Sequence, residues 1–380
     1  MQEQLAYLLC CSDFVRDTLQ RDPTVLRRLI ADKLDIARDA QTYAAGAQQC
    51  LLGEKKKSAP ASRKSVKHST EDNFMRDLRR WRSYELCRIA WRDLLGFAEA
   101  ETILLELSLL ADSAVHVADE FSFQALVQDS GYPRAKGHDD KQPPHRLVTL
   151  AMGKLGGHEL NFSSDIDLIF TYPSDGDTSV DGGEPSASDE HSGVEQFFQK
   201  QVQMIVRLLS ATTSDGFVYR VDLRLRPFGT SGSLALSFDA LRHYYLTQGR
   251  EWERYAMIKA RPITGTASAG EQLQQILQPF IYRRYPDYSV FESLRDLKSR
   301  IAGQLQAAGG QDNIKTGPGG IREIEFIGQA FQLLHGGLEH STAGVLETFA
   351  RFQMRLFSNN AITLYFLYLA VGVADDPMAR

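Results

Sequence analysis

The chain has 380 residues, of which 43% are hydrophobic and 24% are charged, a composition typical of folded globular proteins and not of disordered or fibrous ones. Its 43 Lys and Arg against 48 Asp and Glu give a formal net charge of −5, so any phosphate-binding site must be local. The four cysteines lack metal-ligand spacing, and no apolar run reaches the roughly 20 residues of a membrane span. We therefore expect a cytoplasmic protein of about two to three structural units, with no nucleic-acid or membrane partner.

Residues 1–140 are predicted to form an amino-terminal helical region. Apolar residues recur at helical spacing over residues 71–95 and again over residues 104–117. Asp22 and Pro23 form the pattern of a capped helix start. Residues 54–68, rich in Lys, Ser and Pro, are interpreted as a flexible linker, with a targeting or nucleic-acid segment as the alternative.

Residues 141–265 have a different sequence pattern, with short apolar runs as well as helical spacing, which predicts a small core of strands and helices. The short apolar runs 146–152 and 166–172 are bounded by glycine, proline or polar residues and are predicted to be buried strands. Residues 173–193 have the composition of a surface loop, residues 194–209 return to helical spacing, and residues 217–226 alternate like a third strand. The remaining residues, 266–380, are predicted to form a helical bundle. The expected fold is α+β and mostly helical, with a small mixed sheet flanked by helical segments.

Two carboxylates lie at i and i+2 of the second predicted strand. Asp165 and Asp167 therefore leave the same face, about 7 Å apart at the backbone, and their oxygens can converge on divalent cations. Mg²⁺ prefers such hard oxygen ligands together with substrate phosphate. A pair of turn-capping aspartates is the alternative that this motif leaves open by itself.

The third predicted strand separates two chemically opposite faces. Tyr219, Val221, Leu223 and Leu225 alternate with a polar set that consists of Arg220, Asp222, Arg224 and Arg226. A face of three arginines around one aspartate suits phosphates and metal ions, because burying it without partners is costly. An exposed antiparallel face is the alternative.

Glycines follow the first predicted strand in the segment 153–157 (GKLGG). Because they have no side chain, Gly153, Gly156 and Gly157 let backbone N–H groups beside Lys154 approach a phosphate. Their spacing fits neither a dinucleotide fingerprint nor a P-loop. Glycines at one strand end, two aspartates on the next strand and a third aspartate on a later strand resemble the layout of the polymerase-β-like nucleotidyltransferases.

Four longer strings carry a narrower resemblance. They are residues 153–157 (GKLGG), 161–170 (NFSSDIDLIF), 219–229 (YRVDLRLRPFG) and 318–326 (PGGIREIEF). They resemble the glutamine synthetase adenylyltransferase family, over residues 5 to about 337. Members of that family are bifunctional, with two similar nucleotidyltransferase halves. The wording of these motifs and of residues 252–261 (WERYAMIKAR) is similar to the amino-terminal, adenylyl-removing half.

The resemblance implies an enzyme that removes AMP from an adenylyl-tyrosine of glutamine synthetase. Orthophosphate would attack the phosphorus, releasing ADP and the free tyrosine, with the PII signal protein as regulator. It further implies a site of two Mg²⁺ ions held by Asp165, Asp167 and Asp222. Manganese in place of magnesium is left open.

Further residues are assigned roles around these carboxylates. Gly153, Lys154 and Ser164 are expected to contact phosphate oxygens, and Arg224 and Arg226 to hold orthophosphate or the phosphate of AMP.

Two other groups have a functional and a structural interpretation. Lys315 and Glu325 flank a glycine-rich helix start that could attract an anion, although helix initiation is favoured. Trp252, Arg254 and Tyr255 could stack on or hydrogen-bond to adenine, although their spacing favours core packing.

Two alternative functions stay open from the sequence. One is the reverse modification, in which AMP is added to glutamine synthetase from ATP. The other is a catalytically silent fragment that binds glutamine synthetase or PII. The similarity is expected to fade after Gly337, so the bundle of residues 266–380 is expected to be incomplete, as in a short product, a fragment or a frame-shifted remnant.

Overall fold

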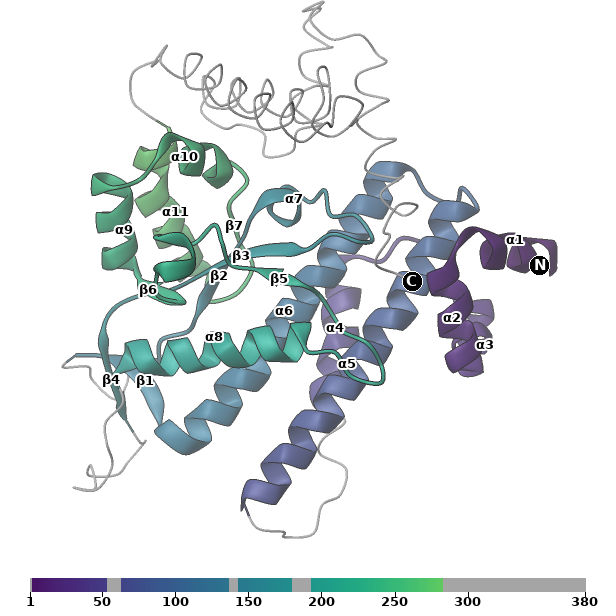
Figure 1. Cartoon of the computed structure of the whole chain (residues 1–380), viewed down its shortest axis with the longest axis horizontal. Coiled ribbons are helices and arrows are strands. Elements are labelled where there is room, and N and C mark those ends of the chain that lie inside the picture. The colour runs from purple at the N-terminus through teal and green to yellow at the C-terminus, as the bar shows by residue number, and fades with distance from the viewer. Residues whose placement is uncertain (1, 53–62, 137–142, 180–192, 283–380) are drawn as a thin grey trace, which may run out of the picture.

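The computed structural model describes residues 2–52, 63–136, 143–179 and 193–282. Within them the fold is α+β, with many helices around a small mixed sheet (Figure 1). The amino-terminal helices are α1 (Gln2–Cys11), α2 (Asp13–Arg21), α3 (Pro23–Ala31), α4 (Ala40–Leu52), α5 (Arg63–Leu94) and α6 (Ala100–Ser130). The later helices are α7 (Gly153–Gly156), α8 (Val194–Ser210), α9 (Phe238–Thr247), α10 (Glu251–Met257) and α11 (Ala267–Ile281), with the 3₁₀ turn η2 (Gly229–Ser231).

The central sheet has five strands in the order β5-β3-β2-β7, with β6 also paired to β3. These strands are β2 (Val148–Ala151), β3 (Ile166–Tyr172), β5 (Val221–Asp222), β6 (Ala235–Ser237) and β7 (Arg261–Pro262). Strand β2 is antiparallel to β3 and β7, whereas β5 and β6 run parallel to β3 along one edge. A separate antiparallel ribbon joins β1 (Tyr132–Ala135) to β4 (Gly176–Ser179).

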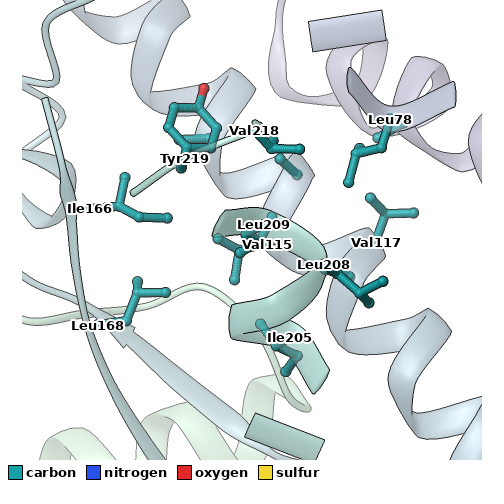
Figure 2. Packing of buried hydrophobic residues seen from close by; sticks show 14 of the residues in the cluster. Leu78, Val115, Val117, Ile166, Leu168, Ile205, Leu208, Leu209, Val218 and Tyr219 are labelled. Carbon is teal, nitrogen blue, oxygen red and sulfur yellow. The ribbon is translucent and has the colours of Figure 1, made fainter. Parts of the chain in front are cut away.

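Helices cover both faces of the central sheet. Alternate residues of β3, including Leu168 and Phe170, join a core with α5, α6 and α8, part of which Figure 2 shows. Ile169 points to the opposite face and packs in a second core with residues of α9, α10 and α11. Burial on both faces explains why this strand is a nearly continuous apolar run.

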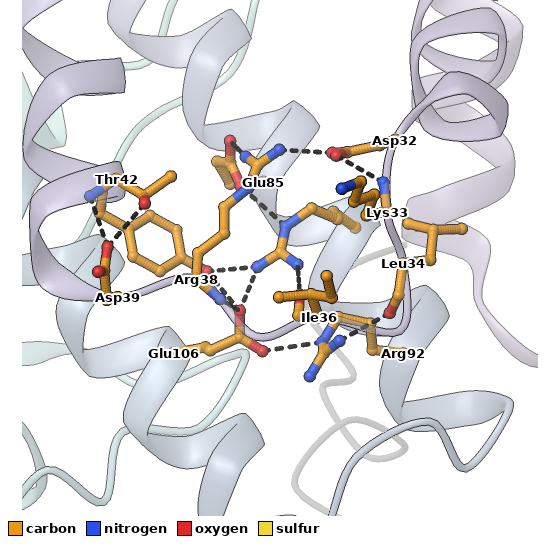
Figure 3. Close-up of polar contacts among 12 residues, drawn as sticks. Asp32, Lys33, Leu34, Ile36, Arg38, Asp39, Thr42, Glu85, Arg92 and Glu106 are labelled. Atoms are coloured by element: carbon orange, nitrogen blue, oxygen red, sulfur yellow. Dashed lines mark hydrogen bonds and ion pairs between the residues drawn. The ribbon is translucent and has the colours of Figure 1, made fainter.

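A buried network of charged side chains fastens the segment between α3 and α4 to the long helices α5 and α6 (Figure 3). Glu106 of α6 accepts hydrogen bonds from Arg88 and Arg92 of α5, and all three side chains are at most 2% exposed. The network also contains Asp32, Arg38, Tyr43 and Glu85. Because Glu85, Arg88 and Arg92 are spaced by three and four residues, they lie on one face of α5.

Several elements follow the sequence-based expectations closely. The predicted strand 166–172 is β3, the predicted helix 194–209 is α8, and Asp22 caps α3 as expected. Of the predicted linker 54–68, residues 54–62 lie outside the described residues, and residues 63–68 belong to α5.

The predicted third strand, residues 217–226, is wrong in its length. Only Val221–Asp222 forms a strand, because the chain turns at Leu223, where the Leu223 carbonyl accepts from the Arg226 backbone N–H. The short strands β1, β4, β6 and β7 were not expected. No helix among the described residues is long and apolar enough to cross a membrane.

Candidate active site

The pairing of β3 with β5 brings three aspartates to one end of the sheet. Asp222 lies opposite Asp167 in the parallel register, and Asp165 immediately precedes β3. Residues 165 and 167 share one side of the chain because successive side chains alternate. The structure therefore brings together the three carboxylates that the sequence analysis selected.

The electrostatics of these carboxylates show that they are close. Burial, together with the charges of Asp222 and Asp165, raises the pKa of Asp167 to about 6. Hydrogen bonds from Arg224 lower the pKa of Asp222 below its usual value. A protein gains nothing in stability from placing like charges beside a half-buried carboxyl, so such a cluster is a candidate for cation binding or catalysis.

Two arginines form hydrogen-bonded ion pairs with Asp165 and Asp222, the carboxylates on either side of Asp167. Arg220 donates to Asp165 and to the Ser163 carbonyl, and Arg224 donates through its side chain and its backbone to Asp222. The arginine side chains are 49% and 78% exposed, and exposed ion pairs of this kind are weak. As they stand, no three His, Cys, Asp or Glu side chains of the described residues form a metal-binding group.

The carboxylates nevertheless have the chemistry that a divalent cation requires. They supply hard oxygen donors, and a cation would offset the repulsion that raises the pKa of Asp167. Asp165 and Asp222 can turn toward a cation by releasing their exposed arginine partners. The residues present therefore fit Mg²⁺ in donor type, with rotation of two side chains.

The glycine turn lies directly against this cluster. Gly153 has a φ of 54°, and a Cβ at this position would lie 2.9 Å from Oδ2 of Asp167. The backbone N–H of Met152 donates to the Asp167 carbonyl at 2.9 Å. Glycine is thus required next to Asp167, both for its conformation and for the close approach.

An arginine that the sequence analysis did not select braces this turn. Arg261 of β7 donates to the carbonyls of Leu155 and Gly156 and forms a two-bonded ion pair with Asp112 of α6. The turn beside Asp167 is therefore held by an amino-terminal helix through Arg261.

The amino-terminal helices also position β5. Arg79 of α5 is fully buried and donates to the carbonyls of Ala211 and Gly216, in the turn that precedes Asp222. In the sequence this arginine is one of several charges between the apolar positions of a helix, and nothing in that pattern distinguishes it from its exposed neighbours.

The other predicted phosphate-binding residues differ in where they lie. Lys154 is half-buried in α7 and follows Gly153 in the chain, and the Ser164 hydroxyl donates to the side chain of Asn161. Arg226 is used differently from the expectation: its guanidinium donates to the carbonyls of Leu223, Thr230 and Gly232 and so braces its own loop.

Of the three α10 residues considered for adenine binding or core packing, two are packed in the core. Arg254 and Tyr255 are buried, and Arg254 donates to the Ile281 carbonyl at 2.8 Å. Trp252 is 40% exposed. Lys315 and Glu325 lie outside the described residues.

Comparison with known proteins identifies the family. The family model of glutamate-ammonia ligase adenylyltransferases matches residues 2–276. The chain belongs to this family. A second family model, of PII-uridylyltransferases, matches residues 295–364. It describes a different family from the one whose similarity we expected to fade after Gly337.

Individual relatives carry one common name. The bifunctional glutamine synthetase adenylyltransferase/adenylyl-removing enzyme of Shewanella oneidensis is 44% identical over 340 residues, which are 90% of this chain and 33% of that protein. The protein of the same name from Pseudomonas putida is 44% identical over 340 residues, which are 90% of this chain and 32% of that protein. The one from Thioalkalivibrio sulfidiphilus is 50% identical over 267 residues, which are 70% of this chain and 26% of that protein. The chain thus spans about one third or less of the curated relatives that it matches.

Proposed function

We propose that residues 141–265 form a polymerase-β-like nucleotidyltransferase core, and that it removes AMP from an adenylyl-tyrosine of glutamine synthetase by phosphorolysis. The observation that supports this most is the register that sets Asp222 beside Asp167, with Asp165 one step away on the same face. The family name and the names of the relatives support a nucleotidyl transfer to or from glutamine synthetase.

The proposed reaction is an in-line displacement at phosphorus. An oxygen of orthophosphate forms a bond to the AMP phosphorus, the bond from phosphorus to the tyrosine oxygen breaks, and the tyrosine oxygen leaves and takes up a proton. ADP and unmodified tyrosine are the products. Mg²⁺ held by Asp165, Asp167 and Asp222 would neutralise charge on the transferring group.

The chain's own side chains would orient the reacting groups. Arg224 is 78% exposed beside Asp222, so its guanidinium can move to an incoming orthophosphate and bind it through paired N–H donors. Arg220 can do the same for the AMP phosphate on the Asp165 side. The fixed turn at Gly153 keeps the space next to Asp167 free of side-chain atoms.

A second direction of the same chemistry is favoured by the relatives' names, which combine adenylyltransferase and adenylyl-removing activities. In that direction the chain would transfer AMP from ATP to glutamine synthetase. The PII protein as a regulator is part of our proposal in either direction.

The two directions separate in one pair of assays. Adenylylated glutamine synthetase, orthophosphate and Mg²⁺ should yield ADP in the presence of the chain. Unmodified glutamine synthetase with ATP labelled at its α-phosphate should gain no label. Label in the protein without ADP release would replace removal by addition, and neither product from a folded sample would leave only a binding role.

A further inference from the structure

The loop that follows Asp222 stays beside the carboxylates. It leaves the edge of β3 where Asp222 pairs with Asp167, and it returns where Ala235 pairs with Phe170. The two ends of the loop are thus three residues apart along β3, or about 10 Å. Residues 223–234 are therefore folded back over one short stretch of the sheet edge, next to the candidate site.

Phe228, within this loop, has an unusual backbone and an exposed ring. Its φ of 61° and ψ of 10° are left-handed, and among the described non-glycine residues only His158, with a φ of 57°, also has a positive φ. Its side chain is 51% exposed. A bulky residue in this region costs about 1 kcal/mol or more, and such strain concentrates at functional sites.

The surrounding loop maintains this conformation. Arg226 donates to the carbonyls of Leu223 at 2.9 Å, Thr230 at 3.0 Å and Gly232 at 3.2 Å. The Ser231 hydroxyl donates to the Phe228 carbonyl at 2.9 Å. Two part-buried and two exposed hydrogen bonds thus hold the loop around an exposed apolar ring.

The ring lies on the same side of the sheet as the carboxylates. Phe228 packs edge-to-face on Tyr244 of α9, with 4.6 Å between ring centroids. Tyr244 belongs to the core that contains Ile169, and Ile169 shares a face of β3 with Asp167 because they are two residues apart. Tyr244 is itself fixed by a 2.7 Å hydrogen bond from its hydroxyl to Glu253.

We propose that Phe228 is the base-stacking residue of this site: the adenine of the adenylyl group, and of ADP, stacks on its ring while the phosphates meet the carboxylates and arginines. This inference rests on the proposed function, since it assigns the base subsite of the same reaction. Stacking on an aromatic ring is favourable for any base, because every base presents a π-face. The subsite therefore selects for a base and discriminates weakly between purines.

The test uses the full chain and compares Phe228→Gly with Phe228→Tyr. Glycine adopts a positive φ without strain, which offsets part of the loss of the contact with Tyr244, so Phe228→Gly removes the ring and should still give a cooperative thermal melt. The dissociation constant for ADP with Mg²⁺, measured by calorimetry, should rise about tenfold or more in Phe228→Gly. It should stay within about twofold in Phe228→Tyr and in Leu246→Ala, which changes an apolar side chain of α9 that is 66% exposed.

Inorganic orthophosphate is the second probe, and its affinity should be the same in all four proteins. Equal ADP affinity in the wild type and in Phe228→Gly would overturn the stacking assignment. If that variant bound ADP normally but showed a raised KM for adenylylated glutamine synthetase, the ring would contact the protein substrate, which also overturns it. Failure of the wild type to bind ADP at all would instead contradict the proposed function.

Discussion

Glu106 offers a stringent test of the buried network in the amino-terminal helices. Its carboxylate, 1% exposed, accepts from Arg88, from Arg92 Nε at 2.9 Å, from the Arg38 backbone N–H at 2.9 Å and from the Tyr43 hydroxyl at 3.1 Å. In Glu106→Gln one carboxylate oxygen becomes an NH₂ group, so at least one buried guanidinium faces a donor. The ionic groups of the network, three arginines and three carboxylates including Asp32 and Glu85, then carry an excess of one positive charge.

The expected loss follows from these contacts. Breaking a buried ion pair from one side costs about 3–5 kcal/mol, and each lost hydrogen bond to a charged group costs about 1.5–3 kcal/mol. We expect a decrease of about 4 kcal/mol in the free energy of unfolding, measured by urea denaturation followed by circular dichroism. Glu101→Gln, on an exposed position in the first turn of the same helix, should lower it by less than about 1 kcal/mol, because it loses only the interaction of its charge with the helix amino terminus.

A double variant separates charge from packing. In Glu106→Gln with Arg92→Met the unmatched positive charge is gone, so the double variant should lose less stability than the sum of its two single variants. A loss below about 1 kcal/mol in Glu106→Gln, or strict additivity in the double variant, would refute the network's ionic role.

Three further predictions concern other parts of the fold. Burial raises the pKa of Asp119 to about 7, so the folded chain loses stability as pH rises from about 4 to about 7. Asp119→Asn should remove this loss and so increase the free energy of unfolding by at most about 4 kcal/mol at pH 8 and by nothing near pH 4. Equal increases at both pH values would contradict this prediction. Gly156→Ala should prevent normal folding in a thermal melt, because a Cβ there would meet two backbone carbonyl oxygens at 1.9 and 2.6 Å, and a normal melting curve would show that the turn adapts. Arg226→Lys should weaken ADP binding about tenfold by loosening the loop that it braces, whereas unchanged binding would assign Arg226 no such role.

The sequence predicted the elements whose burial can be inferred from the hydrophobic pattern of neighbouring residues. Strand β3 was found with its observed bounds, because a run buried on both faces between polar ends has few other interpretations. The predicted strand 217–226 was too long, because apolar and polar residues keep alternating in the sequence after Leu223 although the backbone turns there. Strands β6 and β7, of three and two residues, depend on pairing with distant partners that local patterns do not contain.

The site divides in the same way. Asp165, Asp167 and Asp222 were identified because strand spacing and motif resemblance both point to them, and the register of β3 with β5 brings them together. The bracing role of Arg261 was missed because it depends on carbonyls more than 100 residues away. The left-handed backbone of Phe228 was missed as well, since a proline–phenylalanine–glycine string predicts a loop but not its dihedral angles.

The most direct test of the account compares ADP release by Asp167→Asn and Asp177→Asn. Asp167 lies at the centre of the carboxylate cluster, whereas Asp177 is an exposed aspartate of the separate ribbon. With adenylylated glutamine synthetase, orthophosphate and Mg²⁺, we expect Asp167→Asn to lose at least 99% of turnover, about a 100-fold effect typical of removing one catalytic group. Its melting temperature should not fall, because the change relieves repulsion between neighbouring carboxylates. Asp177→Asn should release ADP at the wild-type rate. Near-normal ADP release by folded Asp167→Asn would contradict the account.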